Sequence, residues 1–401
     1  MKLGIPTGRS LTVLEGAVII AGTSIGAGIL AIPVASYPLG LPLSSILLLG
    51  LGILNLLSAL LLVEAMLRTK KVEHLPGLAK DYLGDWGALL ISASMAFSIY
   101  GALTAYTIAG GLSLCELSVG AVPQWLGSIA YAACAALVVW GGMWWLKNAE
   151  KALFSLMLLL AAAVILIALP FASAKGTGIA FSAIPLAFGV MFFAYYAHQV
   201  IPSVGNAMRG DGRKFAKAVA FGMSFPILAY LVWNVVLVSA IPVADLDLAR
   251  LGGEPVTVPL GRMAGIVAMV VGGIFALLST FTSFAGSAYS MVDAMQDAIY
   301  QWRHAKSSRT FIIILVVAPS LLLALLSPHG FLRALDIVGF YGTGMLIGVF
   351  TPLIYLGALK NGKRKPGFAV PFGKAAAMLI LAVFSAALAF KTVSLMFGWG
   401  A

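Results

Sequence analysis

Long apolar stretches follow one another along almost the whole chain, and short polar stretches separate them. A helix needs roughly 20 mostly apolar residues to cross the hydrocarbon core of a bilayer. Eleven stretches have about this length or more, near residues 11–36, 39–67, 86–114, 125–146, 152–172, 179–205, 216–241, 263–299, 310–327, 333–357 and 371–396. The stretch at 263–299 is too long for one crossing, so we expect its polar end to leave the bilayer. The pattern predicts an all-α polytopic membrane protein with eleven transmembrane helices.

Composition agrees with this pattern. The chain is 61% hydrophobic and only 10% charged, whereas soluble domains are typically about 45–50% apolar and about 25% charged. Lys2 and Arg9 precede the first apolar stretch, as in a signal peptide. That stretch continues to about residue 35 without a small-x-small cleavage site, so we expect a retained first helix. Cys115 and Cys134 form no metal or redox spacing and are interpreted as packing residues.

The basic residues indicate the orientation. With eleven crossings, 20 of the 25 lysines and arginines fall on the side of the N-terminus. Because basic residues concentrate in cytoplasmic loops, we expect a cytoplasmic N-terminus and an external C-terminus in the inner (cytoplasmic) membrane. The net charge of +11 is therefore a signal of topology, and nucleic acid is not an expected partner.

The helix count also suggests a repeat. Five is an odd number, so two consecutive five-helix units lie in the membrane with opposite orientation. We expect an inverted repeat of residues 1–175 and 176–360, with residues 361–401 forming an additional helix 11. Transporters built this way bind substrate near the midplane, between helices that are discontinuous at matching positions of the two halves.

Matching breaks are present in helices 1 and 6. Residues 21–33 read A-G-T-S-I-G-A-G-I-L-A-I-P, and each glycine weakens a helix by about 1 kcal/mol relative to alanine. Residues 192–203 read F-F-A-Y-Y-A-H-Q-V-I-P-S, where Pro202 removes a backbone donor. Both helices are therefore predicted to be discontinuous.

The glycine-rich stretch has three interpretations. Gly22 and Gly26 form a GxxxG pair, which is common where membrane helices pack. Residues 22–26 also spell G-x-S-x-G, so Ser24 with His198 as base could serve an intramembrane serine hydrolase, although that motif needs a strand–turn–helix context. The third interpretation is a carboxylate site, because the N-terminus of a half-helix presents free N–H groups and partial positive charge. The matching break in helix 6 favours the third.

Few ionisable groups lie within the predicted helices. His198 either bonds to a neighbour or carries a proton, because ionisable residues inside a membrane are costly and its ordinary pKa is near 6.5. Glu64 lies close to Arg68, which suggests cytoplasmic anchoring. Asp293 and Asp336 are near helix ends, where they would cap or gate.

Hydroxyl groups gather in helix 8, at Ser279, Thr280, Thr282, Ser283 and Ser287. They either bond back to carbonyls of their own helix or complete a cation site with carbonyls of the unwound helix 1. Aromatic and hydroxyl side chains that could line a pocket, or serve only in packing, are Tyr100, Thr104 and Tyr106 of helix 3 and Tyr341 of helix 10.

Four segments together resemble a known family. They are residues 22–33, residues 78–84 (L-A-K-D-Y-L-G), residues 192–203, and T-S-F at 282–284. They are similar to segments of the hydroxy and aromatic amino acid permeases, the bacterial tyrosine- and tryptophan-specific transporters of the amino acid–polyamine–organocation superfamily. The resemblance spans the whole chain and includes the eleven-helix count.

The resemblance implies roles for the two breaks. The N–H groups around Gly26, Ala27 and Gly28 would hold the substrate carboxylate. The carbonyl of Ser24, with helix 6 carbonyls near Phe192 and Tyr195, would hold the ammonium group. The residues expected to contact substrate are Gly22, Thr23, Ser24, Gly26, Ala27, Gly28, Tyr100, Phe192, Phe193, Ala194, Tyr195 and Tyr196.

The resemblance also bears on the coupling ion. The family's members are proton symporters, and some proton-coupled relatives carry a lysine in helix 5. Here residues 154–158 read F-S-L-M-L, with no lysine deeper than Lys151. Thr282 and Ser283 match the hydroxyl pair of sodium-coupled relatives, so both H⁺, with His198 as carrier, and Na⁺ remain open.

Together these features predict a secondary transporter, without cofactor, that imports an aromatic amino acid by cation symport. Tyrosine and tryptophan are the expected substrates, and H⁺ is the favoured ion. The alternatives are a sodium-coupled carrier, a carrier of small hydroxy amino acids and, from another class, the intramembrane hydrolase.

Overall fold

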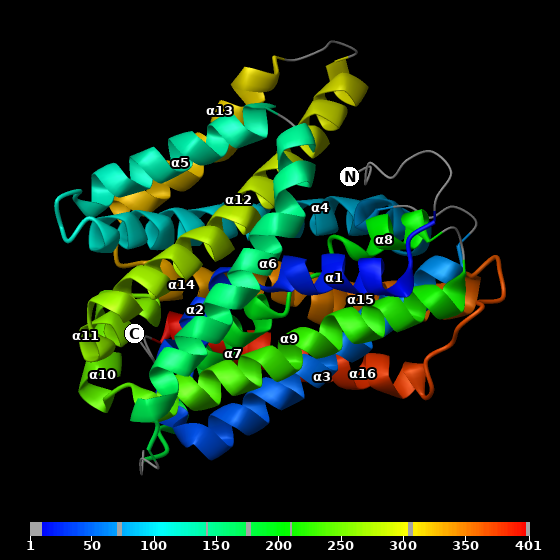
Figure 1. Ribbon diagram of the computed structural model, residues 1–401. Helices are drawn as coiled ribbons and strands as arrows, with labels where there is room; N and C mark the ends of the chain where they lie inside the picture. Colours follow the sequence, from blue (N-terminus) through cyan, green and yellow to red (C-terminus); the bar gives the residue numbers. More distant parts are fainter. Residues whose placement is uncertain are drawn as a thin grey trace.

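The computed structural model describes residues 10–69, 74–141, 143–173, 178–208, 211–303 and 308–397, which form helices and turns without a strand (Figure 1). Nine helices among these residues are long and apolar enough to cross a membrane, and two shorter apolar helices are Val13–Ser24 and Phe181–Ala194. The nine are Ala27–Leu67, Leu75–Leu117, Gln124–Gly141, Leu153–Phe171, Gly212–Ala240, Ile266–Gln296, Arg309–Leu326, Phe331–Asn361 and Gly373–Met396. The all-α membrane fold is confirmed, whereas the count of eleven and the inverted repeat stay predictions.

The first helix is interrupted inside the glycine-rich stretch. Helix α1 (Val13–Ser24) begins with a capping box, in which Thr12 and Glu15 satisfy each other's backbone N–H groups. Ile25 and Gly26 are not helical, and α2 (Ala27–Ser36) continues from there. A short 3₁₀ turn, η1 (Tyr37–Leu39), then leads into α3 (Gly40–Leu67).

The sixth predicted helix is interrupted as well. A 3₁₀ turn, η3 (Phe181–Ala183), precedes α7 (Ile184–Ala194). Residues 195–200 are not helical, and α8 (Ile201–Ala207) begins just before Pro202. Proline is tolerated there because the N–H groups in the first turn of a helix have no partner within the helix.

The remaining bounds differ from the predicted ones where helices join or bend. The remaining elements are α4 (Leu75–Leu117), α5 (Gln124–Gly141), α6 (Met143–Ala168), η2 (Leu169–Phe171), α9 (Gly212–Ala240), α10 (Val243–Gly252), α11 (Thr257–Ala264), α12 (Ile266–Arg303), α13 (Arg309–Leu326), α14 (Phe331–Ile337), η4 (Val338–Phe350), α15 (Thr351–Asn361) and α16 (Gly373–Met396). Gly84 has φ +76° inside α4, so the polar stretch before residue 84 is helical but bent away from the span. Gly265 has φ +81° and separates α11 from α12. Helix α12 then runs from Ile266 to Arg303 as 38 residues, so nearly all of the long stretch at 263–299 lies in one helix.

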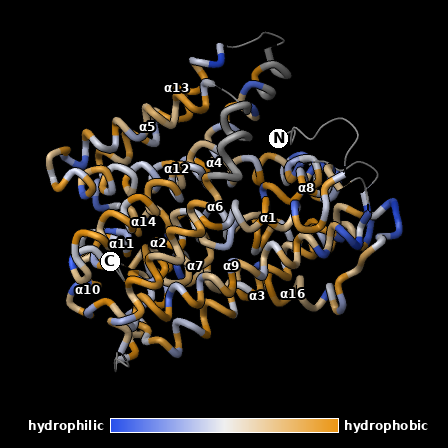
Figure 2. The backbone as a smooth tube through the Cα atoms, in the orientation of Figure 1, coloured by the Kyte–Doolittle hydropathy of each residue, from blue (hydrophilic) through white to orange (hydrophobic). Residues whose placement is uncertain are grey.

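The interrupted helices lie deepest in the molecule. All ten residues of α2 are buried, as are residues 187–194 of α7. Helices α1 and α3 each pack along α9, and α2 packs on α7 (Figure 1). The π-helical segment η4 contacts α4, α7 and α16. Apolar residues follow the helices, while hydrophilic residues gather in loops and at helix ends (Figure 2).

Helices α10 and α11 cover one end of α2. Arg250 donates from Nη1 to the carbonyl of Ala35 at 3.1 Å, and the N–H of Val256 donates to the carbonyl of Leu30 at 2.9 Å. The Tyr37 hydroxyl donates to the Asp247 carboxylate. Burial lowers the pKa of the Arg250 guanidinium, which nevertheless stays protonated because its ordinary pKa is so high. The segment between α9 and α12 therefore holds the end of α2 in place.

Candidate functional site

The break in helix 1 leaves backbone N–H groups at the start of α2 without an acceptor in the helix. Gly26 is the N-cap of α2 and makes no side-chain capping bond. The first N–H groups of a helix have no acceptor within it, and this end carries partial positive charge. The arrangement suits a carboxylate, as the sequence predicts for Gly26, Ala27 and Gly28.

The breaks of helices 1 and 6 meet at Gly28 and Ala194. A Cβ atom on Gly28 would lie 2.5 Å from the Cα and the Cβ of Ala194. Contact at that distance excludes any side chain, so glycine allows the two backbones to touch. The structure thus brings together two segments that are far apart in the sequence.

Tyr230 of α9 joins the two breaks, and the sequence analysis did not identify it. Its hydroxyl is buried and lies 2.6 Å from the carbonyl oxygen of Ser24 and 3.0 Å from that of Ala194. The carbonyl of Ser24, expected to hold a substrate ammonium group, therefore accepts a hydrogen bond from a protein hydroxyl here. A tyrosine in the middle of an apolar helix, one turn before Asn234, was the available signal.

The aromatic residues of helix 6 point in different directions. Phe192 packs on Phe384 of α16, with ring centroids 4.0 Å apart, and Phe193 is buried. Tyr195 donates to the carbonyl of Leu48 in α3 at 3.0 Å. The hydroxyl of Tyr196 is buried and has no hydrogen-bond partner within the described part of the chain. Of the four, Tyr196 offers a free polar group to a ligand.

Of Tyr100 and Tyr106 in α4, the third predicted span, Tyr106 lies beside the break of helix 1 and Tyr100 does not. The Tyr100 hydroxyl donates to the carbonyl of Leu315 in α13 at 3.1 Å. The Tyr106 hydroxyl instead lies beside Ser283 of α12. A Cβ on Gly26 would lie 2.7 Å from the Ser283 Oγ and 3.6 Å from the Tyr106 hydroxyl.

The hydroxyls of α12, the eighth predicted span, divide between bonding within their own helix and lying at the break of helix 1. Thr282 donates to the carbonyl of Leu278 at 2.9 Å, and Thr280 donates to that of Ala276 at 2.7 Å. These bonds satisfy the hydroxyls within their own helix. Ser283, by contrast, lies against Gly26 at the break.

His198 lies in the turn of helix 6 and is fully buried. Its Nε2 is 3.2 Å from the Ser58 Oγ, and that hydroxyl donates to the carbonyl of Ile347 at 2.8 Å. Because Ser58 has only one hydroxyl hydrogen, Nε2 must be the donor to Ser58, which leaves Nδ1 as an unprotonated acceptor. Nδ1 has no partner within the described residues.

The polar residues of the G-x-S-x-G motif hydrogen-bond within their own helix, α1. Ser24 donates to the carbonyl of Ile20 at 3.3 Å, and Thr23 donates to that of Ile19 at 2.8 Å. Gly22 lies against the ring of Phe154 in α6. Since His198 contacts Ser58 and Ser24 bonds back into α1, they do not form a nucleophile–base pair.

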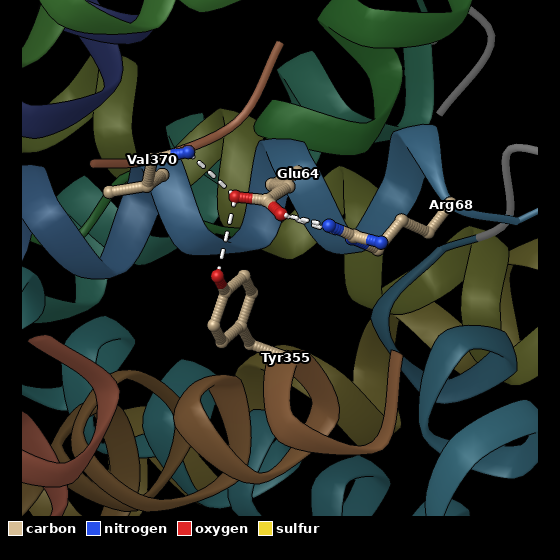
Figure 3. A network of polar contacts seen from close by, with 4 residues as sticks. All are labelled: Glu64, Arg68, Tyr355 and Val370. Carbon is tan, nitrogen blue, oxygen red and sulfur yellow. Dashed lines mark hydrogen bonds and ion pairs between the residues drawn. The ribbon is translucent and has the colours of Figure 1, made fainter. Parts of the chain in front are cut away.

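Glu64 forms a buried polar network away from the breaks (Figure 3). Arg68 donates to one carboxylate oxygen from Nη2 at 2.6 Å and from Nε at 3.0 Å. The N–H of Val370 donates to the other oxygen at 2.7 Å, and the Tyr355 hydroxyl lies 3.4 Å from it. Glu64 thereby fixes the segment between α15 and α16 to the end of α3, in line with the predicted anchoring role.

Three other predicted groups lie apart from the breaks. Asp293 pairs with Arg309 of α13 at 3.2 Å. Cys115 is partly buried, but Cys134 is exposed on α5, so packing describes only the first. Both cysteines are unpaired.

An apolar cavity of about 370 Å³ lies beside the break, between α6 and α9. It is lined by Ile25, Ile29, Met157, Leu158, Ala161, Ala162, Ile165, Phe225, Leu228, Ala229, Val232, Trp233 and Phe275. Phe225, Leu228 and Val232 are exposed on the outside of the helix bundle. The cavity therefore opens at the surface on the side of α9.

Known structures share the fold. The chain resembles the inward-facing conformation of Mhp1, with a TM-score of 0.63 and 15% identity over 100% of this chain and 91% of that one. It also resembles MhsT in complex with L-phenylalanine, with a TM-score of 0.60 and 13% identity over 96% and 100% of the two chains. Both neighbours are LeuT-fold transporters.

Relatives in sequence are transport proteins and not enzymes. Tyrosine-specific transport system 1 of Haemophilus influenzae is 26% identical over 80% of this chain and 82% of its own length. The tryptophan-specific transport protein of Pseudomonas aeruginosa is 25% identical over 93% and 92% of the two chains. The tryptophan/tyrosine permease family matches residues 9–390, and the chain belongs to this family of multi-span membrane transporters.

Proposed function

We propose that this chain imports an aromatic amino acid, tyrosine or tryptophan, across the inner membrane by symport with a cation. The juxtaposition of the two breaks carries the proposal. The uncapped N-terminus of α2 lies beside the C-terminal end of α7. Opposite helix ends carry opposite partial charges, so the pair suits the carboxylate and ammonium groups of one amino acid zwitterion.

The aromatic substrate class is inferred from the relatives that are named for tyrosine and tryptophan transport. The unpaired Tyr196 hydroxyl adds local support. A buried polar group without a partner costs about 1–3 kcal/mol, and a phenol or indole N–H on the substrate would relieve that cost. The substrate-contacting residues proposed above remain those of the two breaks.

We propose H⁺ as the coupled ion, with His198 as a candidate carrier, and an N-terminus on the cytoplasmic side. The free Nδ1 of His198 supports this role because it can accept a proton. Na⁺ held near Ser283 and Thr282 is the alternative, supported by the closeness of Ser283 to Gly26.

Uptake by purified protein in proteoliposomes tests the function. We expect saturable uptake of labelled tyrosine or tryptophan, driven by an imposed pH gradient in sodium-free buffer, and little competition by serine or threonine. No saturable uptake under either a pH or a sodium gradient would refute aromatic amino acid transport. Uptake that needs Na⁺ would refute only the choice of ion.

His198→Ala tests the carrier separately. If His198 carries the proton, this variant exchanges substrate across the membrane but no longer accumulates it in response to pH. Unchanged accumulation removes His198 from the coupling step.

A further inference from the structure

A buried ion pair links α14 to α16 beside the broken helix 6. Lys391 Nζ lies 2.5 Å from Oδ2 of Asp336, and the two residues are only 6% and 5% exposed. The partners are 55 positions apart in the sequence. This pair takes no part in the Glu64 network or in the contacts at the two breaks.

Such a pair is poorly explained by stability. Moving both charges out of water costs several kcal/mol per ion, and apolar residues of similar volume often serve the fold equally well. Ionisable residues inside a membrane protein mark ion or proton sites more often than structural ones. A functional role is therefore the more economical explanation.

The surroundings of Asp336 leave one carboxylate oxygen free. Oδ1 has no hydrogen-bond partner among the residues that the structure describes. Glu64, the other buried carboxylate among the described residues, has hydrogen-bond partners on both oxygens. Asp336 can therefore take a proton on Oδ1 without giving up a hydrogen bond there.

The free oxygen faces α7, the outer half of broken helix 6. A Cβ on Gly189 would lie 2.4 Å from Asp336 Oδ1, and one on Gly339 would lie 1.9 Å from the carbonyl oxygen of Gly189. Backbones of α7 and η4 thus touch at the carboxylate. Ala194, which meets helix 1, lies five residues further along α7, or about 7.5 Å at 1.5 Å per residue.

The charged and titratable groups around Asp336 are few. Helices α7 and α2 have no titratable residue, and the π-helical segment η4 has only Tyr341, which bonds to Thr392. From α4 the tyrosine nearest in sequence to the contact with Val338 is Tyr100, which bonds to Leu315. Arg333 of α14 is exposed. Lys391 is therefore the cation that balances Asp336 directly.

The ammonium group of Lys391 can reach water when Asp336 no longer carries a negative charge. Lys391 lies five residues before the end of α16 at Met396, and a lysine near a helix end can extend its ammonium group to the membrane surface. Phe340, whose ring centre is 5.5 Å from Nζ, packs on Phe188 of α7. Departure of Lys391 would therefore also loosen the contact between η4 and α7.

We propose that Asp336, in place of the candidate His198, binds the coupling proton and that Lys391 is the internal cation that neutralises Asp336 when the proton leaves. The carboxylate is then neutralised in both states, by H⁺ or by the ammonium group. Proton binding releases Lys391 and frees α7 to move at the end that holds the substrate. Among the described residues His198 has no comparable counter-charge, since its Nε2 bonds to the Ser58 hydroxyl and its Nδ1 has no partner. The inference rests on the proposed proton symport.

The test uses a neutral pair in which D336N and K391Q are combined. Wild type is expected to accumulate tryptophan up to about tenfold in proteoliposomes under a gradient of about one pH unit. The neutral pair is expected to exchange labelled for unlabelled tryptophan within about threefold of the wild-type rate, yet to show no pH-driven accumulation. An internal pH dye should report substrate-induced acidification in wild type and none in the variant.

The control variant combines E254Q and R262Q, which neutralises an ion pair at the surface, and it should accumulate like wild type. Retained pH-driven accumulation in the neutral pair overturns the proposal. Loss of exchange together with accumulation also overturns it, because the pair would then be structural. A wild-type protein without pH-driven uptake would instead refute proton symport itself.

Discussion

Replacing Tyr230 by phenylalanine removes one oxygen and leaves the ring in place. The ring contact with Tyr195, at 5.2 Å between centroids, is retained. What is lost is a buried hydroxyl that serves the carbonyls of Ser24 and Ala194. A neutral hydrogen bond contributes about 0.5–1.5 kcal/mol, and a buried group left unpaired costs about 1–3 kcal/mol. We expect a total near 1–3 kcal/mol, because one hydrogen is shared by two acceptors.

This free energy applies only while the two breaks lie side by side. The arrangement should therefore become about 5- to 150-fold less favoured relative to one in which the breaks separate. Two measurements follow from this: the Tm of the protein in nanodiscs, expected to fall by about 1–4 °C, and tryptophan uptake, expected to slow at least about fivefold. Tyr341→Phe is the matched control, because it removes the same oxygen from an exposed bond to Thr392. If Tyr230→Phe matches this control in Tm and uptake, Tyr230 does not hold the breaks together.

Three further substitutions test the two breaks and the Glu64 network. Gly28→Ala puts a methyl group 2.5 Å from Ala194 and should reduce uptake more than tenfold, whereas Gly50→Ala, whose methyl group would have no atom of the described residues within 4 Å, should not. Equal uptake in the two variants would show that the breaks tolerate separation. Glu64→Ala should lower stability by about 3 kcal/mol, because it leaves buried donors unpaired, and should speed proteolysis between α15 and α16; unaltered cleavage would argue against anchoring. Ser24→Ala removes only a hydroxyl bonded within α1 and should leave uptake within about twofold; abolished uptake would show that the hydroxyl itself, and not only the carbonyl, is needed.

The sequence was sufficient for features that depend on local chemistry. The length of each apolar stretch determines whether a helix can cross the bilayer, so the spans at 39–67, 310–327 and 371–396 agree closely with α3, α13 and α16. Glycine and proline act on the backbone where they stand, so the breaks near Gly26 and before Pro202 were also predictable. Their closeness in space was expected only from the topology argument and the family resemblance.

Tertiary structure decided which side chains face the breaks. Helix rotation is fixed by packing on all sides, and apolar membrane helices show little difference between their faces. The ring of Phe192 therefore packs on Phe384, and Tyr230 joins the breaks without having been predicted. The same holds for the pairing of Asp336 with Lys391. Sequence determined that the helices break and where, but only the packing of distant helices determined what the breaks contact.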